Sequence, residues 1–113
     1  MKDLAPEIYR QRLVIEGYPN DKVKAKAVKK YLSGLSSALD MRIVKKPVTS
    51  RSKMYGEAGW IHWESSGAHF YGWDQPRLFF SVDIYTCKRF KAEDALKYTK
   101  DFFKVGHLEY KEF

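Results

Sequence analysis

Apolar residues recur at helical spacing in two stretches of the chain. In the first, apolar side chains return every three or four positions from Val23 to Leu39. This spacing predicts a helix over about residues 21–39. Asn20 or Asp21 can cap its start, because either side chain accepts hydrogen bonds from the free backbone N–H groups of a first turn. A second helix is predicted by the same reasoning from residue 92 to residue 103.

Strands are predicted where apolar and polar residues alternate, or where β-branched and aromatic residues cluster. The strongest such run is Leu78 to Tyr85. Residues 45–59 contain Pro47, two serines and two glycines, and we interpret them as a long, functional or mobile loop. The other predicted strands cover residues 11–16, 41–44, 60–64, 68–73 and 107–113.

The resulting order is strand, helix, strand, loop, three strands, helix and a last strand. Neighbouring strands joined by short turns form antiparallel hairpins, and two amphipathic helices need one sheet face to cover. The sequence therefore predicts an α+β fold, a two-layer sandwich in which two helices lie on one face of an antiparallel sheet. The length of 113 residues fits a single domain over residues 1–113.

Composition narrows the class of protein. The chain is 44% hydrophobic and 31% charged, which is typical of a globular domain with its own core. No apolar run approaches the roughly 18 residues that cross a bilayer, and the start of the chain lacks the apolar stretch of a signal peptide. Cys87 is the single cysteine, and a free thiol fits a reducing compartment. We expect a cytoplasmic protein with no membrane partner.

The formal charge of +7 raises the question of a nucleic-acid partner. The lysines that dominate it are interleaved with the apolar positions of the first predicted helix, which is the pattern of a solvated helix face. Nucleic acid is therefore not expected as a partner. These lysines are Lys22, Lys24, Lys26, Lys29 and Lys30.

Few residues form a local chemical motif. The sequence has no glycine-rich phosphate loop, and its three histidines, His62, His69 and His107, are too scattered to predict a metal site. A nucleophilic pair of Cys87 with His62 or His69 is one interpretation. The segment Trp63 to His69 is more unusual, because it places Glu64, two serines and a glycine between two predicted strands. Taken alone, this segment is typical of a tight turn.

The wider arrangement resembles the small prokaryotic S-adenosylmethionine decarboxylases. Members of that family carry Glu-Ser-His at a strand turn, a tryptophan several residues later, a strand ending in Val-Asp-aromatic-Thr-Cys, and a helix with Ala-Leu-x-Tyr. Here the counterparts are the Glu64 to Gly67 turn, Trp73, the strand end Val82 to Cys87, and Ala95 to Tyr98. The resemblance covers about residues 10–104 and is most specific at Val82 to Cys87.

The resemblance implies a self-cleaving enzyme of polyamine (spermidine) biosynthesis. In that family the chain cuts itself between Glu and Ser, and the serine becomes an N-terminal pyruvoyl group. The pyruvoyl carbonyl forms a Schiff base with the substrate amine and acts as an electron sink during decarboxylation. On this chain, Cys87 matches the cysteine that returns a proton to the product, and Trp73 matches a tryptophan near the bound nucleoside.

The pyruvoyl precursor has two candidates. If Glu64 matches the family's glutamate, the precursor is Ser65. If Trp73 is the anchor, the precursor is Ser66, which we prefer because this alignment needs no gap. The family's self-processing histidine then becomes Tyr71, with His69 two residues earlier.

The resemblance also implies a homodimer that shares its sheets or active-site residues and binds S-adenosylmethionine. Two alternatives stay open. One is a decarboxylase for another amino acid, such as arginine. The other is an uncleaved homologue that acts as a binding or regulatory protein.

Overall fold

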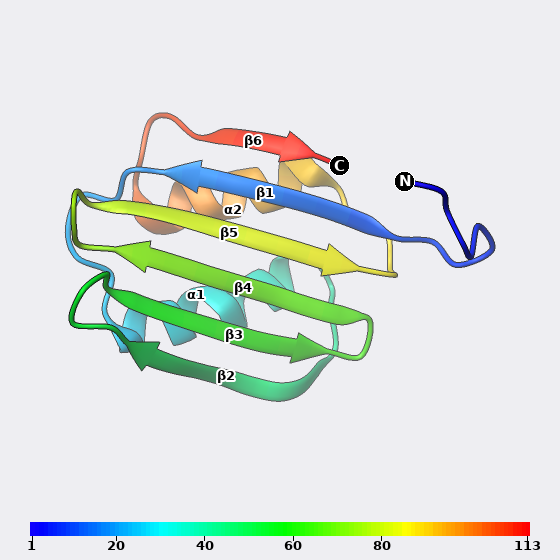
Figure 1. Cartoon of the computed structure of the whole chain (residues 1–113), viewed down its shortest axis with the longest axis horizontal. Coiled ribbons are helices and arrows are strands. Elements are labelled where there is room, and N and C mark those ends of the chain that lie inside the picture. The colour runs from blue at the N-terminus through cyan, green and yellow to red at the C-terminus, as the bar shows by residue number, and fades with distance from the viewer.

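A six-stranded antiparallel sheet and two helices make up the protein, in a computed structural model that describes all 113 residues (Figure 1). The strand order is β2-β3-β4-β5-β1-β6, and both helices pack on the same face, so the predicted α+β two-layer sandwich is confirmed. In chain order the elements are β1 (Gln11–Gly17), α1 (Ala25–Ala38), β2 (Ile43–Arg51), β3 (Glu57–Trp63), β4 (Ser66–Trp73), β5 (Phe79–Thr86), α2 (Ala92–Phe103) and β6 (Glu109–Glu112).

The core lies between the helices and the inner face of the sheet. It contains 17 buried apolar residues, most of which come from the inner stripe of each helix and from alternate strand positions, while Val23, Leu39 and Met41 flank α1. Buried polar groups inside it are paired. The indole Nε1–H of Trp63 donates to Ser36 Oγ at 2.6 Å, and Ser36 Oγ donates to the Leu32 carbonyl at 2.9 Å. Tyr31 and Thr99 join the two helices through their hydroxyls, 2.7 Å apart.

The prediction of a long loop over residues 45–59 is wrong. Strand β2 runs to Arg51 and β3 begins at Glu57, so only residues 52–56 connect them. Pro47 suggested a loop because it cannot donate a ladder hydrogen bond. It is tolerated because β2 is an edge strand whose register with β3 shifts between Lys45 and Val48.

The predicted start of the first helix is also wrong. Helix α1 begins at Ala25, and its N-cap residue, Lys24, makes no side-chain cap. Asn20 instead donates its side-chain amide to the carbonyls of Phe103 and Lys104, at 3.5 and 3.2 Å. It therefore satisfies the carboxyl end of α2 rather than the amino end of α1.

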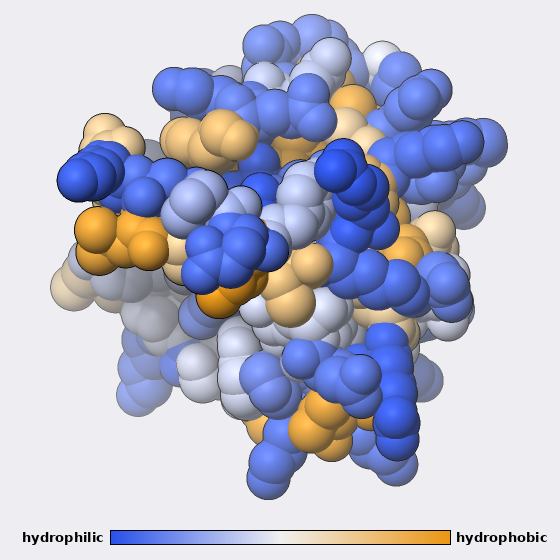
Figure 2. Space-filling model, turned by 90° about the vertical axis from the view of Figure 1, so that its right-hand side faces the viewer, coloured by the Kyte–Doolittle hydropathy of each residue, from blue (hydrophilic) through white to orange (hydrophobic).

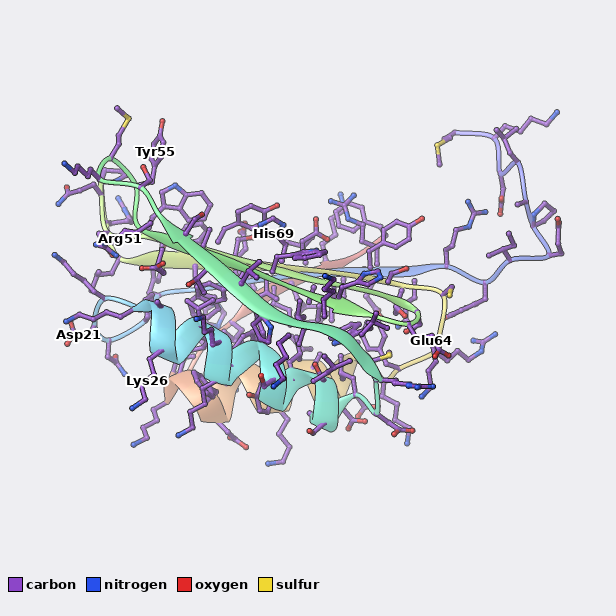
Figure 3. All side chains as sticks on the ribbon, turned by 90° about the horizontal axis from the view of Figure 1, so that it is seen from below. Asp21, Lys26, Arg51, Tyr55, Glu64 and His69 are labelled. Carbon is purple, nitrogen blue, oxygen red and sulfur yellow. The ribbon has the colours of Figure 1, made fainter.

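The other face of the sheet carries no helix, and we call it the open face. Strand alternation places six aromatic, histidine and acidic side chains on it: Trp60, His62, His69, Tyr71, Asp83 and Tyr85. Figure 3 shows both helices below the sheet and His69 on the opposite side. Neither α1 nor α2 has the length and apolar character needed to span a bilayer.

Candidate functional site

The serine turn and Cys87 lie side by side at one end of the sheet, which we call the turn end (right in Figure 1). Trp63 pairs with Ser66, so Glu64 and Ser65 form the tight turn between β3 and β4. Ser66 pairs in turn with Thr86, the last residue of β5. The backbone N–H of Cys87 donates to the Ser65 carbonyl oxygen at 2.9 Å. Strand register thus joins two segments that are far apart in the sequence.

Ser66 has an unusual backbone. Its φ of 126° lies where side chains other than glycine are rarely found. The neighbouring Gly67 is needed for another reason, because a Cβ there would lie 2.3 Å from the Ile61 carbonyl oxygen. The conformational strain at this turn therefore falls on the serine, while the glycine permits the close approach of β3.

The side chains around the turn are held apart by their partners. Ser65 Oγ donates to Met41 Sδ at 3.3 Å beneath the turn. The Glu64 carboxylate pairs with the exposed Arg42 at 3.2 Å. The Cys87 side chain is exposed. Figure 2 views this end of the molecule, where polar side chains dominate and apolar atoms form small separate patches.

His69 lies on the open face, away from the turn. It pairs with Asp83 across the strands and stacks on Tyr71, with ring centroids 4.2 Å apart and planes 9° from parallel. Burial lowers the pKa of His69, and the negative charge of Asp83 partly opposes that shift. No hydrogen bond links Cys87 to His69 or to His62, which pairs with Gly67. The structure does not bring together the cysteine–histidine pair considered from the sequence.

Trp73 lies at the opposite end of the sheet, which we call the pocket end. Strand β4 has 8 residues from Ser66 to Trp73, so at roughly 3.3 Å per residue these two lie about 23 Å apart. Trp73 lines a cavity of about 280 Å³ together with Ser52, Tyr55 and Tyr71. Figure 3 shows Arg51 and Tyr55 at the pocket end, Glu64 at the turn end, and His69 between them.

Ion pairs hold the wall of this pocket. Arg51 contacts Asp74 and lies 3.5 Å from Glu57, whose side chain is almost fully buried. The N–H of Asp74 donates to the Tyr55 carbonyl at 2.6 Å, which ties the β2–β3 connection to the residues after β4. Sequence reasoning missed Tyr55 because it assigned this region to a loop. The alternation of the two strands that flank it could have revealed the hairpin.

A second, shallower cavity of about 390 Å³ lies on the open face between the two ends. Its walls include His69, Tyr71 and Asp83. Nowhere in the chain do three or more histidine, cysteine, aspartate or glutamate side chains come close enough to hold a metal ion. The open face instead presents aromatic rings that could stack on a ligand. It also carries the Asp83 carboxylate, which pairs with Arg12 at 2.9 Å.

Comparison with known proteins finds a family and a similar fold. The model of the S-adenosylmethionine decarboxylase family matches residues 11–113. The fold is similar to that of a crystal structure of the adenosylmethionine decarboxylase from Aquifex aeolicus VF5, with a TM-score of 0.77 and 15% sequence identity. That match covers 94% of this chain and 89% of the other. Comparison with curated protein sequences finds no match. The family match spans nearly the whole chain, and the protein therefore belongs to the S-adenosylmethionine decarboxylase family.

Proposed function

We propose that this protein is a pyruvoyl-dependent decarboxylase that cuts itself before Ser66 and acts on S-adenosylmethionine. The observation that carries the proposal is the hydrogen bond from the Cys87 N–H to the Ser65 carbonyl. If Ser66 Oγ attacks the peptide bond before it, that carbonyl is the one attacked. Negative charge then develops on an oxygen that already accepts a backbone hydrogen bond, as in an oxyanion hole.

Self-cleavage can be written with the chain's own atoms. Ser66 Oγ bonds to the Ser65 carbonyl carbon while the Ser65–Ser66 amide bond breaks, leaving an ester and a free Ser66 amine. Loss of the Ser66 Cα proton to a base expels Ser65 as a carboxylate. Water then replaces the nitrogen, which departs as ammonia, and a pyruvoyl group remains. When formed, that group supplies an electron sink for decarboxylation.

Two further features favour Ser66 over Ser65 as the nucleophile. The unusual φ of 126° belongs to Ser66, so opening its peptide bond relieves strain that is already present. The hydroxyl of Ser65 is instead engaged with Met41 Sδ. Glu64, which pairs with Arg42, has no role in this scheme beyond shaping the turn.

Cys87 is proposed to return a proton to the product. Its side chain is exposed, and its backbone touches the serine turn directly. A neutral thiol at that position can deliver a proton to a carbanion formed beside the turn.

A complete site would need a second copy of the chain. Trp73 and its pocket lie about 23 Å from Ser66, too far for one small substrate to touch both. Two open faces stacked on a two-fold axis that crosses the strands would bring the pocket end of one copy over the turn end of the other. The exposed Trp60, Tyr71 and Tyr85 support a homodimer of this kind. We place the nucleoside of the substrate against Trp73 and Tyr55.

One observation favours the second candidate, an uncleaved homologue with a binding or regulatory role. Tyr71 stands where the family's self-processing histidine is expected, and a tyrosine is a weaker base near neutral pH. His69 stacks on Tyr71 and could take over proton transfer.

Intact mass spectrometry of the purified protein decides between the two candidates. The proposal predicts fragments 1–65 and 66–113, the second blocked at its N-terminus. Ser66→Ala should stay a single 13.3 kDa species, whereas Ser65→Ala should still be cleaved. A wild-type protein that remains at 13.3 kDa would favour the uncleaved homologue. For the cleaved protein, carbon dioxide release from S-adenosylmethionine or arginine identifies the substrate.

A further inference from the structure

A row of side chains crosses the middle of the open face, and we call it the central row. The strand registers pair His69 of β4 with Trp60 of β3 and with Asp83 of β5. Asp83 is paired in turn with Val14 of β1. Directly paired residues of antiparallel strands point to the same face of a sheet. Figure 3 shows His69 between the pocket end and the turn end, so the central row lies between the two halves of the proposed site.

The two ends of β4 determine where a two-fold axis would pass. This inference rests on the stacked homodimer of the proposed function, in which the partner's Trp73 lies over Ser66. A two-fold axis that crosses the strands reverses the direction along them and keeps each strand over its own counterpart. Trp73 can lie over Ser66 only if the axis passes midway between these residues, beside His69 and Phe70. Phe70 is buried in the core, so His69 is the side chain that faces the partner there.

We propose that two copies of this chain meet on their two-fold axis at the central row. At roughly 3.3 Å per residue, His69 then lies about 3 Å along the strands from its counterpart in the partner. The axis crosses β3 beside Trp60, so His62 lies about 17 Å along the strands from its own counterpart. Contacts between identical residues are therefore expected in the central row and not at the two ends of the sheet.

Charge favours a second copy as the occupant of the open face. The chain carries a formal charge of +7, so two copies repel each other wherever the excess positive charge meets. The charged residues at positions paired on the open face are Arg12, Lys45 and Lys111, and Glu16, Asp83 and Glu109. Their charges cancel. A balanced face does not repel its own copy, and it has no excess positive charge to attract a polyanion such as nucleic acid.

The side chains of the central row also suit contact with themselves. The Asp83 carboxylate accepts two hydrogen bonds from Arg12, at 3.0 and 2.9 Å, so the row does not bring two unpaired negative charges together. Burial lowers the pKa of His69, which favours the neutral ring. Two neutral imidazole rings can share a hydrogen bond, because each has one donor and one acceptor nitrogen. Trp60, which is 39% exposed, adds apolar surface beside them.

Cross-linking through single cysteines tests the position of the axis. Cys87 is the only cysteine, so a Cys87→Ser background leaves one thiol in each variant. A short bis-maleimide can bridge two stacked sheets, which lie about 10 Å apart, but not thiols that are also about 17 Å apart along the strands. We expect His69→Cys to be joined to its counterpart and His62→Cys, the matched control on the same face, to stay unlinked. Any result in which His69→Cys is not linked more than His62→Cys would overturn the central row.

A like charge placed at the axis tests the same contact through the affinity of the dimer. His69→Lys sets two ammonium groups close together and should raise the dissociation constant about tenfold in sedimentation equilibrium. His62→Lys adds the same charge about 17 Å from its counterpart, beyond the screening length of about 8 Å in 0.15 M salt, and should raise the constant less than about threefold. Equal effects of the two variants would contradict the central row.

Intact mass of the Cys87→Ser protein reads self-cleavage separately. Serine at position 87 keeps the backbone N–H that donates to the Ser65 carbonyl, so cleavage before Ser66 should persist. A cleaved protein that fails the cross-linking test would overturn only the central row. An uncleaved protein that passes it would overturn only the self-cleavage. A monomeric protein would overturn the central row together with the two-copy site.

Discussion

The two faces of the sheet are built from the same kinds of residues but differ in what covers them. Trp63, Phe70 and Phe80 on the inner face are completely buried, whereas Trp60 and Tyr71 on the open face are 39% and 36% exposed. Both faces are rich in aromatic side chains, yet the helices close only one. The inner face therefore determines the stability of the single chain, and the open face keeps apolar surface that stays partly exposed after the chain has folded.

Adjacent positions on β4 give the sharpest test of this difference. Phe70→Ala should lower the free energy of unfolding by about 3–5 kcal/mol, because it leaves a cavity in a closed core. Tyr71→Ala, one residue later on the open face, should cost less than about 1 kcal/mol. Guanidinium denaturation at a protein concentration low enough to keep single chains measures both. Equal losses would show that the open face is also part of the folding core.

The polar contacts of the inner face predict a second, smaller effect. Ser36→Ala removes the acceptor of the Trp63 indole and leaves a buried N–H unpaired. The expected loss is about 1–3 kcal/mol of unfolding free energy.

Ser37→Ala, on the exposed side of the same helix, is the control and should change stability by less than about 0.5 kcal/mol. If Ser36→Ala and Ser37→Ala have equal free energies of unfolding, the buried hydrogen bond contributes nothing to the stability of the inner face.

The open face should show the smallest effect, a dependence on pH. Burial lowers the pKa of His69 below its usual 6.5, so the unfolded chain binds this proton more readily than the folded one. The stability that depends on a neutral His69 is therefore fully present above pH 6.5 and declines as the pH falls below that value.

Melting curves measured on either side of this pH would test the role of His69. His69→Gln should make the melting temperature less dependent on pH, and His107→Gln, at an exposed position, is the control. An equal fall in wild type and His69→Gln would assign the pH dependence to another group.

The sequence predicted the elements well where pattern alone decides them. The strands around Val82 and the helix from residue 92 to residue 103 appear where alternation and helical spacing placed them. The predicted strand over residues 41–44 overlaps the start of β2, but its continuation to Arg51 was missed because Pro47 breaks the pattern. Only the position of β2 at the sheet edge makes proline acceptable there. Asn20 was assigned to the wrong helix because its partners, the carbonyls of Phe103 and Lys104, are distant in sequence.

The candidate site was predicted from the family resemblance, and the roles of its residues stay predictions. The resemblance put the serine turn and Cys87 in one site, and strand register does bring their backbones into contact. Trp73 was placed near the bound nucleoside because it matches the tryptophan of the family, and this role stays a prediction. Strand β4 is extended, so at roughly 3.3 Å per residue Trp73 and Ser66 lie about 23 Å apart within one chain.

The backbone of Ser66 also has a consequence for anyone who would redesign this protein. Glycine is the residue that best suits a φ of 126°, and the present serine costs of order 1–3 kcal/mol there. A protocol that optimises heat tolerance residue by residue would choose Ser66→Gly early. The variant would be more stable to heat but would lack the Ser66 hydroxyl on which the proposed self-cleavage depends. Screening for thermal stability alone would therefore remove an atom that screening for activity would retain.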